Sequence, residues 1–566
     1  MSRKIVVAIW CGLIAVRVAL GLSFIRANSA TGDEPLYIAA GYIALHAGDF
    51  SVNSGHPPLT KLLAGAAASA VWAPPYAHDP DWRGGAYRPF DEFFYADRVY
   101  ATLGERAELV TMVARVPGML LGLVLCGVCG VWAHRRWGAP AGILALALTA
   151  LDPNLIAHSC VVGTDGPLAC FLVLAIYLAW EYAQRPSRRL LVGIGLGFGL
   201  ALATKFSAAV VSPVIAVLVF HAGRVALGRR GWRWIGGAVG AGAVVVAIAL
   251  AVLLASYGST GLHEWRIGMG SQLAHQSSGH PAFLRGELSR DGWWYYFPVA
   301  VFAKTPAVTL VVVIAGLAWW HRRPGRRWLD TWALLLPAAV FFAFNVVLSV
   351  NPGVRYVLAV YPFLFVAAGS LACAVPARAR AAAVAGAIAA VAATTLPAAP
   401  HQLAYFSHFI GGPDRGDRWL SDSNIDWGQD LGGLSAWLNE RGGAAYLAYY
   451  GRFPPSYLGT RFQYAPGFTR PPTEQRDSWL VEPAPRYLAV SVTNLHGTYT
   501  GNPALYAWLA PYAPVAKIGY SIFVYDLHAI PDAHRHLAEA YTAIGDEGFA
   551  RAELARAAPG SAAPHR

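Results

Sequence analysis

Charged residues are scarce in this sequence. Only 13% of its 566 residues are Asp, Glu, Lys or Arg, while 56% are hydrophobic, and a soluble protein ordinarily has about 25% charged residues. The composition excludes an ordinary soluble globular protein and predicts a polytopic α-helical membrane protein. Because carboxylates are costly inside a bilayer, those at an aqueous boundary are the first candidates for chemistry.

Cysteines and phosphate-binding glycine loops are also scarce or missing. The six cysteines all lie in or at the ends of apolar segments, and none follows residue 400, so no disulfide framework is predicted. No glycine-rich loop of the Walker or dinucleotide type is present, which argues against a nucleotide donor and against ATP-driven transport. The histidines lack His-x-x-x-His spacing, so no metal or cofactor is predicted to be required, although Asp33, Asp165 and histidines could converge on a divalent ion.

Eleven apolar segments predict the membrane-spanning helices. They cover approximately residues 5–25, 107–133, 139–157, 165–183, 190–204, 206–222, 234–257, 298–319, 329–349, 355–373 and 380–397. The first segment contains Arg17, is long enough to span the bilayer and lacks a small-residue cleavage site. We therefore interpret it as a retained anchor and not as a signal peptide.

Basic residues mark one side of the membrane. They cluster in alternate connections, at Arg135-Arg136, Arg185 to Arg189, Arg224 to Arg233, His321 to Arg327 and Arg378 to Arg380. The positive-inside rule makes that side cytoplasmic, so the net charge of +12 needs no nucleic-acid partner. The long outward regions are residues 26–106, residues 258–297 and the chain after about residue 400. The expected location is a bacterial inner membrane, with the working face in the periplasm.

The chain after the last apolar segment predicts a small soluble α/β domain over residues 400–530. Aromatic and β-branched runs predict strands at residues 444–451, 486–494 and 517–525. Leucines at helical spacing predict a helix over residues 430–441. Residues 531–566 resemble a single helix pair of the tetratricopeptide type, and because one such repeat cannot bury a core by itself, we expect it to cap the soluble domain.

Several motifs follow one another at outward or boundary positions. They read Gly32-Asp33-Glu34, then His56-Pro57-Pro58-Leu59-Thr60-Lys61, Leu151-Asp152-Pro153-Asn154, Thr164-Asp165, Ser278-Gly279-His280-Pro281, Gly292 to Pro298, Lys304-Thr305-Pro306, Asn351-Pro352-Gly353-Val354-Arg355-Tyr356 and Asp422 to Asp430. Over residues 1–399 this order resembles the bacterial GT-C glycosyltransferases that use a polyprenyl-phosphate sugar donor. Within that superfamily it is most similar to the branch of the protein O-mannosyltransferases and the lipid A aminoarabinose transferase. Unlike the eukaryotic O-mannosyltransferases, the sequence has no β-trefoil insertion.

The resemblance implies an inverting transfer from a polyprenyl-phosphate sugar to an outward acceptor hydroxyl on a protein, lipid or glycan. It implies that Asp33 is the general base, and that Glu34 orients Asp33 or binds the acceptor. A structural interpretation competes with this one. Thr31-x-x-Glu34 is a capping-box pattern, and Asp33-Glu34-Pro35 suits the first turn of a helix.

A departing lipid phosphate needs cations, and five basic residues lie near outward segment ends: Lys61, Arg115, Lys205, Lys304 and Arg355. Arginine suits bidentate phosphate contacts and lysine a point-charge contact. For any single one of them, snorkelling to the interface explains the position as well. Arg355 is preferred because the Asn-Pro-Gly turn aims it, and Lys61 follows because it ends the His-Pro-Pro-Leu-Thr-Lys motif.

Further candidates for the substrate pocket are His56, Asp165, His280, Trp293, Tyr295, Tyr356 and Asp426. The two histidines precede prolines, which places them in loops. Asp165 is equally suited to start a helix, and the aromatic residues from 293 to 297 are equally suited to anchor at the interface. The run from Asp422 to Asp430 predicts either a lid over the catalytic loops or a turn into the next helix.

Two other classes of protein remain open from the sequence. A transporter or flippase for a lipid-linked sugar would also be polytopic, but it should place ionisable residues near the membrane midplane and often shows internal repeats. We find no repeat, and the acids gather at outward ends. A non-catalytic scaffold that binds partners through its soluble domain is the second alternative.

Overall fold

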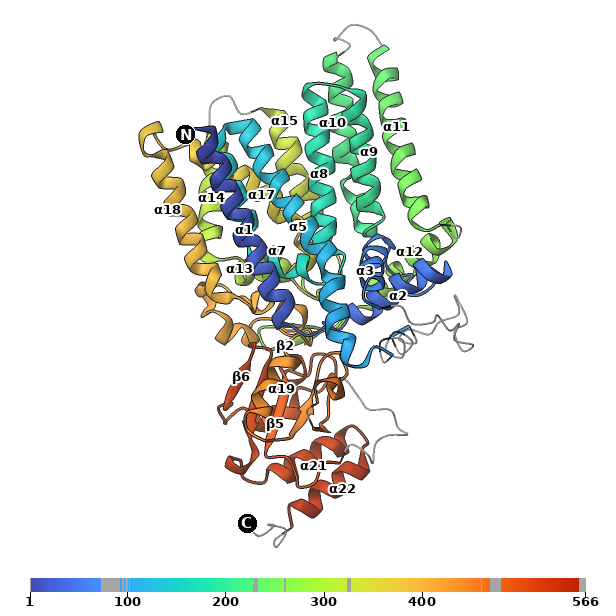
Figure 1. Ribbon diagram of the computed structural model, residues 1–566, viewed down its shortest axis with the longest axis vertical. Helices are drawn as coiled ribbons and strands as arrows, with labels where there is room; N and C mark the ends of the chain where they lie inside the picture. Colours follow the sequence, from blue (N-terminus) through green and yellow to red (C-terminus); the bar gives the residue numbers. More distant parts are fainter. Residues whose placement is uncertain are drawn as a thin grey trace.

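The computed structural model describes residues 2–72, 92–93, 96, 100, 102–226, 233–258, 261–322, 327–459, 461–468 and 480–558. A helical bundle forms one end of the molecule and a small domain with a β-sheet forms the other (Figure 1). Parts of two predicted basic loops (227–232 and 323–326), of the first outward region (73–91) and of the C-terminal tail (559–566) lie outside the described residues.

Seven helices in the described residues are long and apolar enough to cross a membrane, and they make the protein a multi-pass membrane protein. The helices that form these spans are α1 (Arg3–Ala27), α5 (Ala107–Trp137), α8 (Asp165–Gln184), α10 (Ser212–Ala226), α11 (Arg233–Ser256), α15 and α16 (Trp328–Asp330 and Leu336–Val346) and α18 (Ala377–Thr395). The peripheral helices α1, α11 and α18 bury few of their side chains inside the protein. Their apolar surfaces are therefore available to lipid.

Two bent helix pairs and two short helices account for the remaining predicted segments. Helix α6 (Ala139–Leu151) meets α7 (Pro153–Cys160) at 58°, and α13 (Tyr296–Lys304) meets α14 (Ala307–Arg322) at 113°. A proline lies at each break: Pro153 is the first residue of α7, and Pro306 lies between α13 and α14. Proline has no N–H group with which to continue the preceding helix. Helices α9 (Arg188–Leu202) and α17 (Val360–Gly369) are shorter than a full span.

The structure thus confirms the predicted fold class. The part of the chain that the structure describes has seven spans, or nine when each bent pair counts as one. The eleven predicted segments become eleven spans only if the two short helices are included.

Three short helices lie at the outer boundary of the bundle. They are α2 (Glu34–Ala47), α3 (Leu59–Ser69) and α12 (Gly261–Ser278), and α12 is followed by a hairpin of β1 (Ala282–Leu284) and β2 (Glu287–Ser289). Helices α2 and α3 approach so closely that a Cβ on Gly41 would lie 1.8 Å from the Lys61 carbonyl oxygen. Glycine at this position therefore fixes α2 directly against the His-Pro-Pro motif.

The C-terminal domain is built on a five-stranded mixed sheet of order β4-β3-β5-β7-β6. Its strands are β3 (Ala445–Ala448), β4 (Phe462–Tyr464), β5 (Tyr487–Ser491), β6 (Ala516–Ile518) and β7 (Ile522–Asp526). Strand β3 pairs parallel with both β4 and β5, while β7 pairs antiparallel with β5 and β6. The segment predicted as one strand at 517–525 is in fact the β6–β7 hairpin, and β4 was not predicted.

Two helical elements cover this sheet. Helix α19 (Leu431–Asn439) buries the three predicted leucines. The hairpin of α21 (Ala533–Ala543) and α22 (Glu547–Arg556) docks through a fully buried Glu553, which accepts hydrogen bonds from Tyr446, Gln463 and Arg556. The helix pair therefore packs on the sheet as a cap.

One hydrophobic cluster joins the two parts of the molecule. It contains Leu434 and Val524 of the C-terminal domain together with Tyr37 and Ile38 of α2 and Val110 of α5. Apolar area removed from water stabilises a contact by about 25 cal/mol per Å². The C-terminal domain is therefore held against the outer boundary of the bundle, where the motif residues lie.

Candidate active site

Asp33 is free of the capping role that the sequence left open. It occupies the N-cap position of α2, but its side chain makes no cap hydrogen bond. Its carboxylate, 31% exposed, lies 3.8 Å from the Arg355 guanidinium. A partly exposed carboxylate that makes no cap hydrogen bond has oxygens left to accept a hydrogen bond from a ligand.

Glu34 has the opposite environment. It is fully buried, its two oxygens accept from Arg115 at 2.8 and 2.7 Å, and it also accepts from the backbone N–H groups of Thr31 (2.7 Å) and Val162 (2.8 Å). The Thr31 contact is half of the predicted capping box. Glu34 is therefore saturated with donors, a position that fits support behind Asp33 and does not fit direct contact with an acceptor.

Arg355 has unused hydrogen-bonding capacity. It lies in the short helix η4 (Val354–Val357) behind the Asn-Pro-Gly turn, and its partners Asp33 and Asp165 are each 3.8 Å away. Its Nε is buried without a hydrogen-bond partner among the described residues. A guanidinium with a free N–H edge is suited to bind an anion in its plane.

A second cation completes this group. Lys205 follows α9 and donates to Asp165 at 2.6 Å, and its Nζ lies 4.2 Å from the centre of the Tyr356 ring. Asp165 is the first residue of α8, and its side chain lies between the two cations. Lys205, one of the five predicted cations, thus lies beside Arg355 in the structure.

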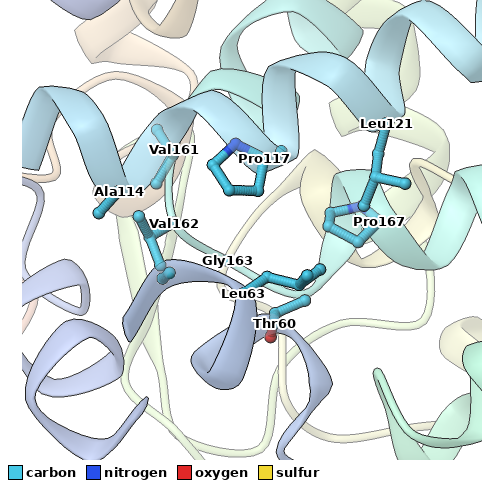
Figure 2. Close-up of a pocket in the computed structure, with 11 residues that line it drawn as sticks. Thr60, Leu63, Ala114, Pro117, Leu121, Val161, Val162, Gly163 and Pro167 are labelled. Atoms are coloured by element: carbon cyan, nitrogen blue, oxygen red, sulfur yellow. The ribbon is translucent and has the colours of Figure 1, made fainter. Parts of the chain in front are cut away.

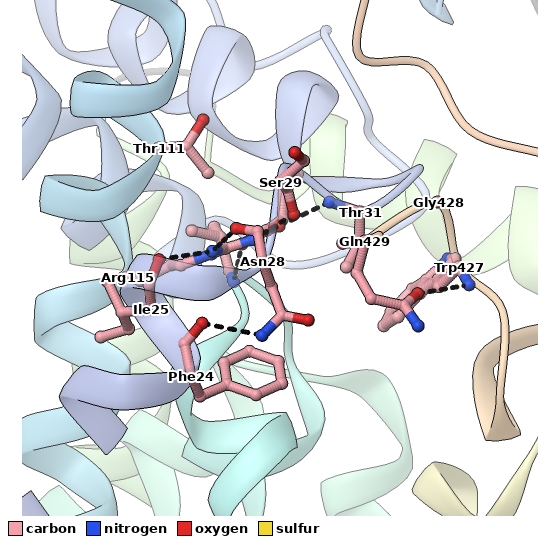
Figure 3. Close-up of polar contacts among 12 residues, drawn as sticks. Phe24, Ile25, Asn28, Ser29, Thr31, Thr111, Arg115, Trp427, Gly428 and Gln429 are labelled. Carbon is pink, nitrogen blue, oxygen red and sulfur yellow. Dashed lines mark hydrogen bonds and ion pairs between the residues drawn. The ribbon is translucent and has the colours of Figure 1, made fainter. Parts of the chain in front are cut away.

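The other three predicted cations are enclosed by protein acceptors. Arg115 uses its remaining N–H groups on the carbonyl oxygens of Ile25, Asn28 and Ser29 (Figure 3). Lys61 donates to the carbonyl oxygens of Val52, Asn53 and His56, and burial lowers the pKa of its ammonium to about 7.

Lys304 donates to the carbonyl oxygens of Leu403 (2.7 Å) and Asn424 (2.5 Å). Its ammonium also lies over the Phe406 ring, 4.5 Å from the centre, and its side chain is 1% exposed. These contacts give Arg115, Lys61 and Lys304 structural positions and leave Arg355 (18% exposed) and Lys205 (12% exposed) as the less enclosed cations.

The two predicted histidines contact different parts of the protein, His56 the helix α2 and His280 the C-terminal domain. His56 stacks on Tyr37 of α2, with ring centres 5.7 Å apart, and burial lowers its pKa to about 3. His280 is 3.3 Å from the Tyr499 hydroxyl, and burial lowers its pKa to about 4. Both rings are therefore neutral at pH 7, and each contributes a hydrogen-bonding edge and no charge.

The C-terminal domain supplies residues that the sequence analysis did not single out. Asp422 accepts from Tyr499 (2.6 Å) and from Tyr450 (3.4 Å), and the two tyrosine rings stack 5.1 Å apart. The Trp427 ring lies 4.3 Å from the Arg355 guanidinium. The motif from Asp422 to Asp430 was the signal that could have identified both Asp422 and Trp427.

Three of the predicted pocket residues lie away from Asp33. The side chain of Asp426 is fully buried in the C-terminal domain and accepts from the Thr493 backbone, and burial raises its pKa to about 7. Trp293 packs on Tyr296, and its backbone N–H donates to Asn351. Tyr295 is exposed and packs edge-on against Trp294, which fits an interfacial anchor.

The surroundings of Asp33 contain groups that raise its pKa and groups that lower it. Burial raises the pKa of the Asp33 carboxyl, Arg355 opposes this rise, and the nearby acids Asp422 and Asp165 reinforce it. A raised pKa makes the carboxylate a stronger base than an ordinary aspartate. Among the described residues, no group of three or more His, Cys, Asp or Glu side chains is arranged to hold a metal ion.

These features define a multi-pass membrane protein with an acid and cation site at the end of its helical bundle that meets the C-terminal domain. Comparison with known proteins specifies the class further. Residues 106–253 match the family model described as dolichyl-phosphate-mannose-protein mannosyltransferase. This match confirms the resemblance to GT-C glycosyltransferases that the motifs predicted. No curated protein sequence matches the chain.

Two crystal structures of ArnT from Cupriavidus metallidurans are similar to this structure. The one bound to undecaprenyl phosphate has 15% sequence identity and a TM-score of 0.48, and the apo form has 14% identity and a TM-score of 0.47. In each comparison 90% of this chain and 96% of the other chain are covered.

Proposed function

We propose that this membrane glycosyltransferase moves a sugar from a polyprenyl-phosphate donor to an acceptor hydroxyl on the periplasmic face of a bacterial inner membrane, with inversion at the sugar carbon. The observation that carries the proposal is the Asp33–Arg355 pair. Its carboxylate has no structural hydrogen bond at the helix start, and its guanidinium has a free N–H edge. A polyprenyl-phosphate donor also agrees with the description of the family that residues 106–253 match.

The chemistry assigns a role to each side of the pair. Asp33 takes the proton of the acceptor hydroxyl as its oxygen attacks the anomeric carbon, and the bond from that carbon to the phosphate oxygen breaks. The negative charge that returns to the phosphate is stabilised by Arg355 and Lys205, which are already in place. The Asp33 carboxylate also lies where it can stabilise the positive charge that develops on the sugar ring.

A narrow apolar slot beside this group provides a path for the lipid tail. Leu63 of α3, Pro117 and Leu121 of α5, Val162 and Pro167 line it, and their side chains surround one space in Figure 2. Pro167 is two residues beyond Asp165 in α8, which connects one wall of the slot to the helix start that holds Asp165. Its open volume is about 10 Å³, about enough for one water, so an isoprenoid unit enters only if the walls move apart.

The ionisable residues at the two helix breaks do not favour a transporter. Asp152 lies at the α6–α7 break, and its carboxylate caps α7 by accepting from the Leu155 backbone at 2.8 Å. Lys304 lies at the α13–α14 break and is held by two backbone carbonyl groups. Each is used in the structure of the break itself, which leaves Asp33 as the acid that faces a substrate.

The test compares Asp33→Asn with Asp291→Asn, which removes an exposed acid of the second outward loop. A deletion strain receives the wild-type protein or one variant, and mass spectrometry measures the glycolipids and glycoproteins of its envelope. We expect Asp33→Asn to lower transfer by about 10²–10⁴-fold and Asp291→Asn to leave it unchanged. Retained transfer by a folded Asp33→Asn protein would exclude Asp33 as the base, and lipid flipping in vesicles without a transfer product would favour the transporter.

A further inference from the structure

The segment Ser421–Asp430 connects the bundle to the sheet domain and is unusual in its burial. It begins with the short helix η10 (Asp422–Asn424) and ends where α19 starts. All ten of its residues are buried, although it is rich in polar side chains. Buried polar groups need partners. Many partners of this segment lie in the rest of the C-terminal domain, and others lie in the two turns that carry Asp33 and Arg355.

The first of these turns lies directly before Asp33. The Gly32 N–H donates to the Trp427 carbonyl oxygen at 2.8 Å, and the Ser29 N–H donates to the Gln429 carbonyl oxygen at 2.8 Å. Trp427, Gln429 and Ser29 lie together in Figure 3. The backbone of the segment thus pairs with the backbone that leads into the proposed base.

The second turn lies directly before Arg355. Ser423 Oγ donates to the Pro352 carbonyl oxygen at 3.0 Å, and the Val354 N–H donates to Asn424 Oδ1 at 3.0 Å. A Cβ on Gly353 would lie only 2.8 Å from Ser423 Oγ. The glycine of the Asn-Pro-Gly motif therefore lets the segment approach the turn this closely.

Between these two attachments, the Trp427 ring covers the Arg355 guanidinium. The guanidinium carbon lies 4.3 Å from the ring centre, within the range of a cation–π contact. The ring itself is 4% exposed and belongs to a cluster with Phe24, Ile25 and Met119. A guanidinium whose face is covered keeps its in-plane N–H groups free, and the unpartnered Nε of Arg355 is one of them.

We propose that Ser421–Asp430 is a fixed part of the active site, in which Trp427 is a positioning residue that presents the edge of Arg355 to the donor phosphate. The inference rests on the proposed function, since it uses the phosphate of that donor. It also excludes the lid interpretation of this segment, because opening would break the hydrogen bonds to both turns. Without the segment Ser421–Asp430, the turns that carry Asp33 and Arg355 would lose the hydrogen bonds that support both of them.

The test measures binding of polyprenyl monophosphate to the full-length protein in detergent. Trp427→Leu removes the π face and Trp427→Phe keeps one. The matched control is Trp437→Leu, because Trp437 lies 4.3 Å from the Arg441 guanidinium in the same domain but outside the site. We expect Trp427→Leu to weaken binding about tenfold, Trp427→Phe to recover most of the loss, and Trp437→Leu to bind as the wild type does.

A double-variant cycle separates positioning from general packing. If Trp427 acts through Arg355, Trp427→Leu should have little further effect on binding once Arg355→Ala is present. An equal loss in both backgrounds would overturn the proposal, and so would wild-type binding by a folded Trp427→Leu protein.

A second variant covers the case in which Trp427→Leu fails to fold. Ser423→Ala removes only the hydroxyl that holds Pro352, and we expect phosphate binding about fivefold weaker. Unchanged binding in Ser423→Ala would then overturn the proposal. The assay contains no sugar transfer, so its failure is distinct from retained transfer by Asp33→Asn, which would overturn the proposed function itself.

Discussion

Two pairs of an acidic and a basic residue, whose acids are neighbours in the sequence, differ in burial and in hydrogen bonding. Glu34 and Arg115 are both fully buried, they meet at 2.7 Å, and backbone groups use their other hydrogen-bonding positions. Asp33 and Arg355 are partly exposed and 3.8 Å apart. The first pair is complete without a ligand and the second is not. Spare donors and partial exposure thus separate the proposed reactive pair from the structural pair more clearly than charge does.

The largest expected effect comes from a variant that breaks the buried Glu34–Arg115 pair. Glu34→Gln leaves the Arg115 guanidinium buried without its counter-charge, and losing one partner of a buried pair costs about 3–5 kcal/mol. We expect a large drop in the melting temperature of the detergent-solubilised protein. Asp33→Asn, one residue away, should melt like the wild type. Equal melting of both variants would contradict the contrast between the pairs.

The next largest expected effect comes from a change in the partly exposed Asp33–Arg355 pair. Arg355→Lys keeps the charge but loses the planar edge, because an ammonium is a point charge without the bidentate fork. We expect polyprenyl monophosphate to bind about tenfold more weakly, with an unchanged melting temperature. Lys61→Arg is the control, since Lys61 is enclosed by backbone carbonyl groups. Lys61→Arg can lower the melting temperature, but the folded variant should bind polyprenyl monophosphate as the wild type does.

The smallest effect is a pH shift that sharpens the role of Asp33. The base must be ionised, and its pKa is raised, so the rate should fall with decreasing pH above the usual aspartate range of about 3.9. Asp422 contributes to that rise. Asp422→Asn should therefore move the acid limb of the pH–rate profile to lower pH. A limb that stays in place would show that Asp422 does not act on the titrating group.

The sequence predicts the helices well because apolar length alone determines which segments can cross a bilayer. It does not predict how sharply they bend: Pro306 indicates a break after Lys304, but the angle of 113° depends on what packs around it. In the soluble domain, Gly519 permitted the turn that divides residues 517–525 into two strands. The β-branched pattern of that run hid the turn.

Within the candidate site, the motifs predicted Asp33 and Arg355 but did not show which of the other cations are enclosed by protein. Arg115 and Lys205 look alike in sequence, since each lies near the outward end of an apolar segment. What separates them is Glu34, which lies 81 positions before Arg115, and Asp165, which lies 40 positions before Lys205. Such distant pairings follow from the packing of α2, α5 and α8 and not from any local pattern.

The contact between Ser29 and Gly432 joins residues 403 positions apart. The turn that carries Asp33 is among the first parts of the chain to be made, and the segment that supports it is among the last. Contacts this distant in sequence form late, after the chain between them has been ordered. Asp33, the proposed base, and Arg355 therefore reach their final geometry only when the C-terminal domain has docked, so a chain that lacks this domain should not assemble the proposed site.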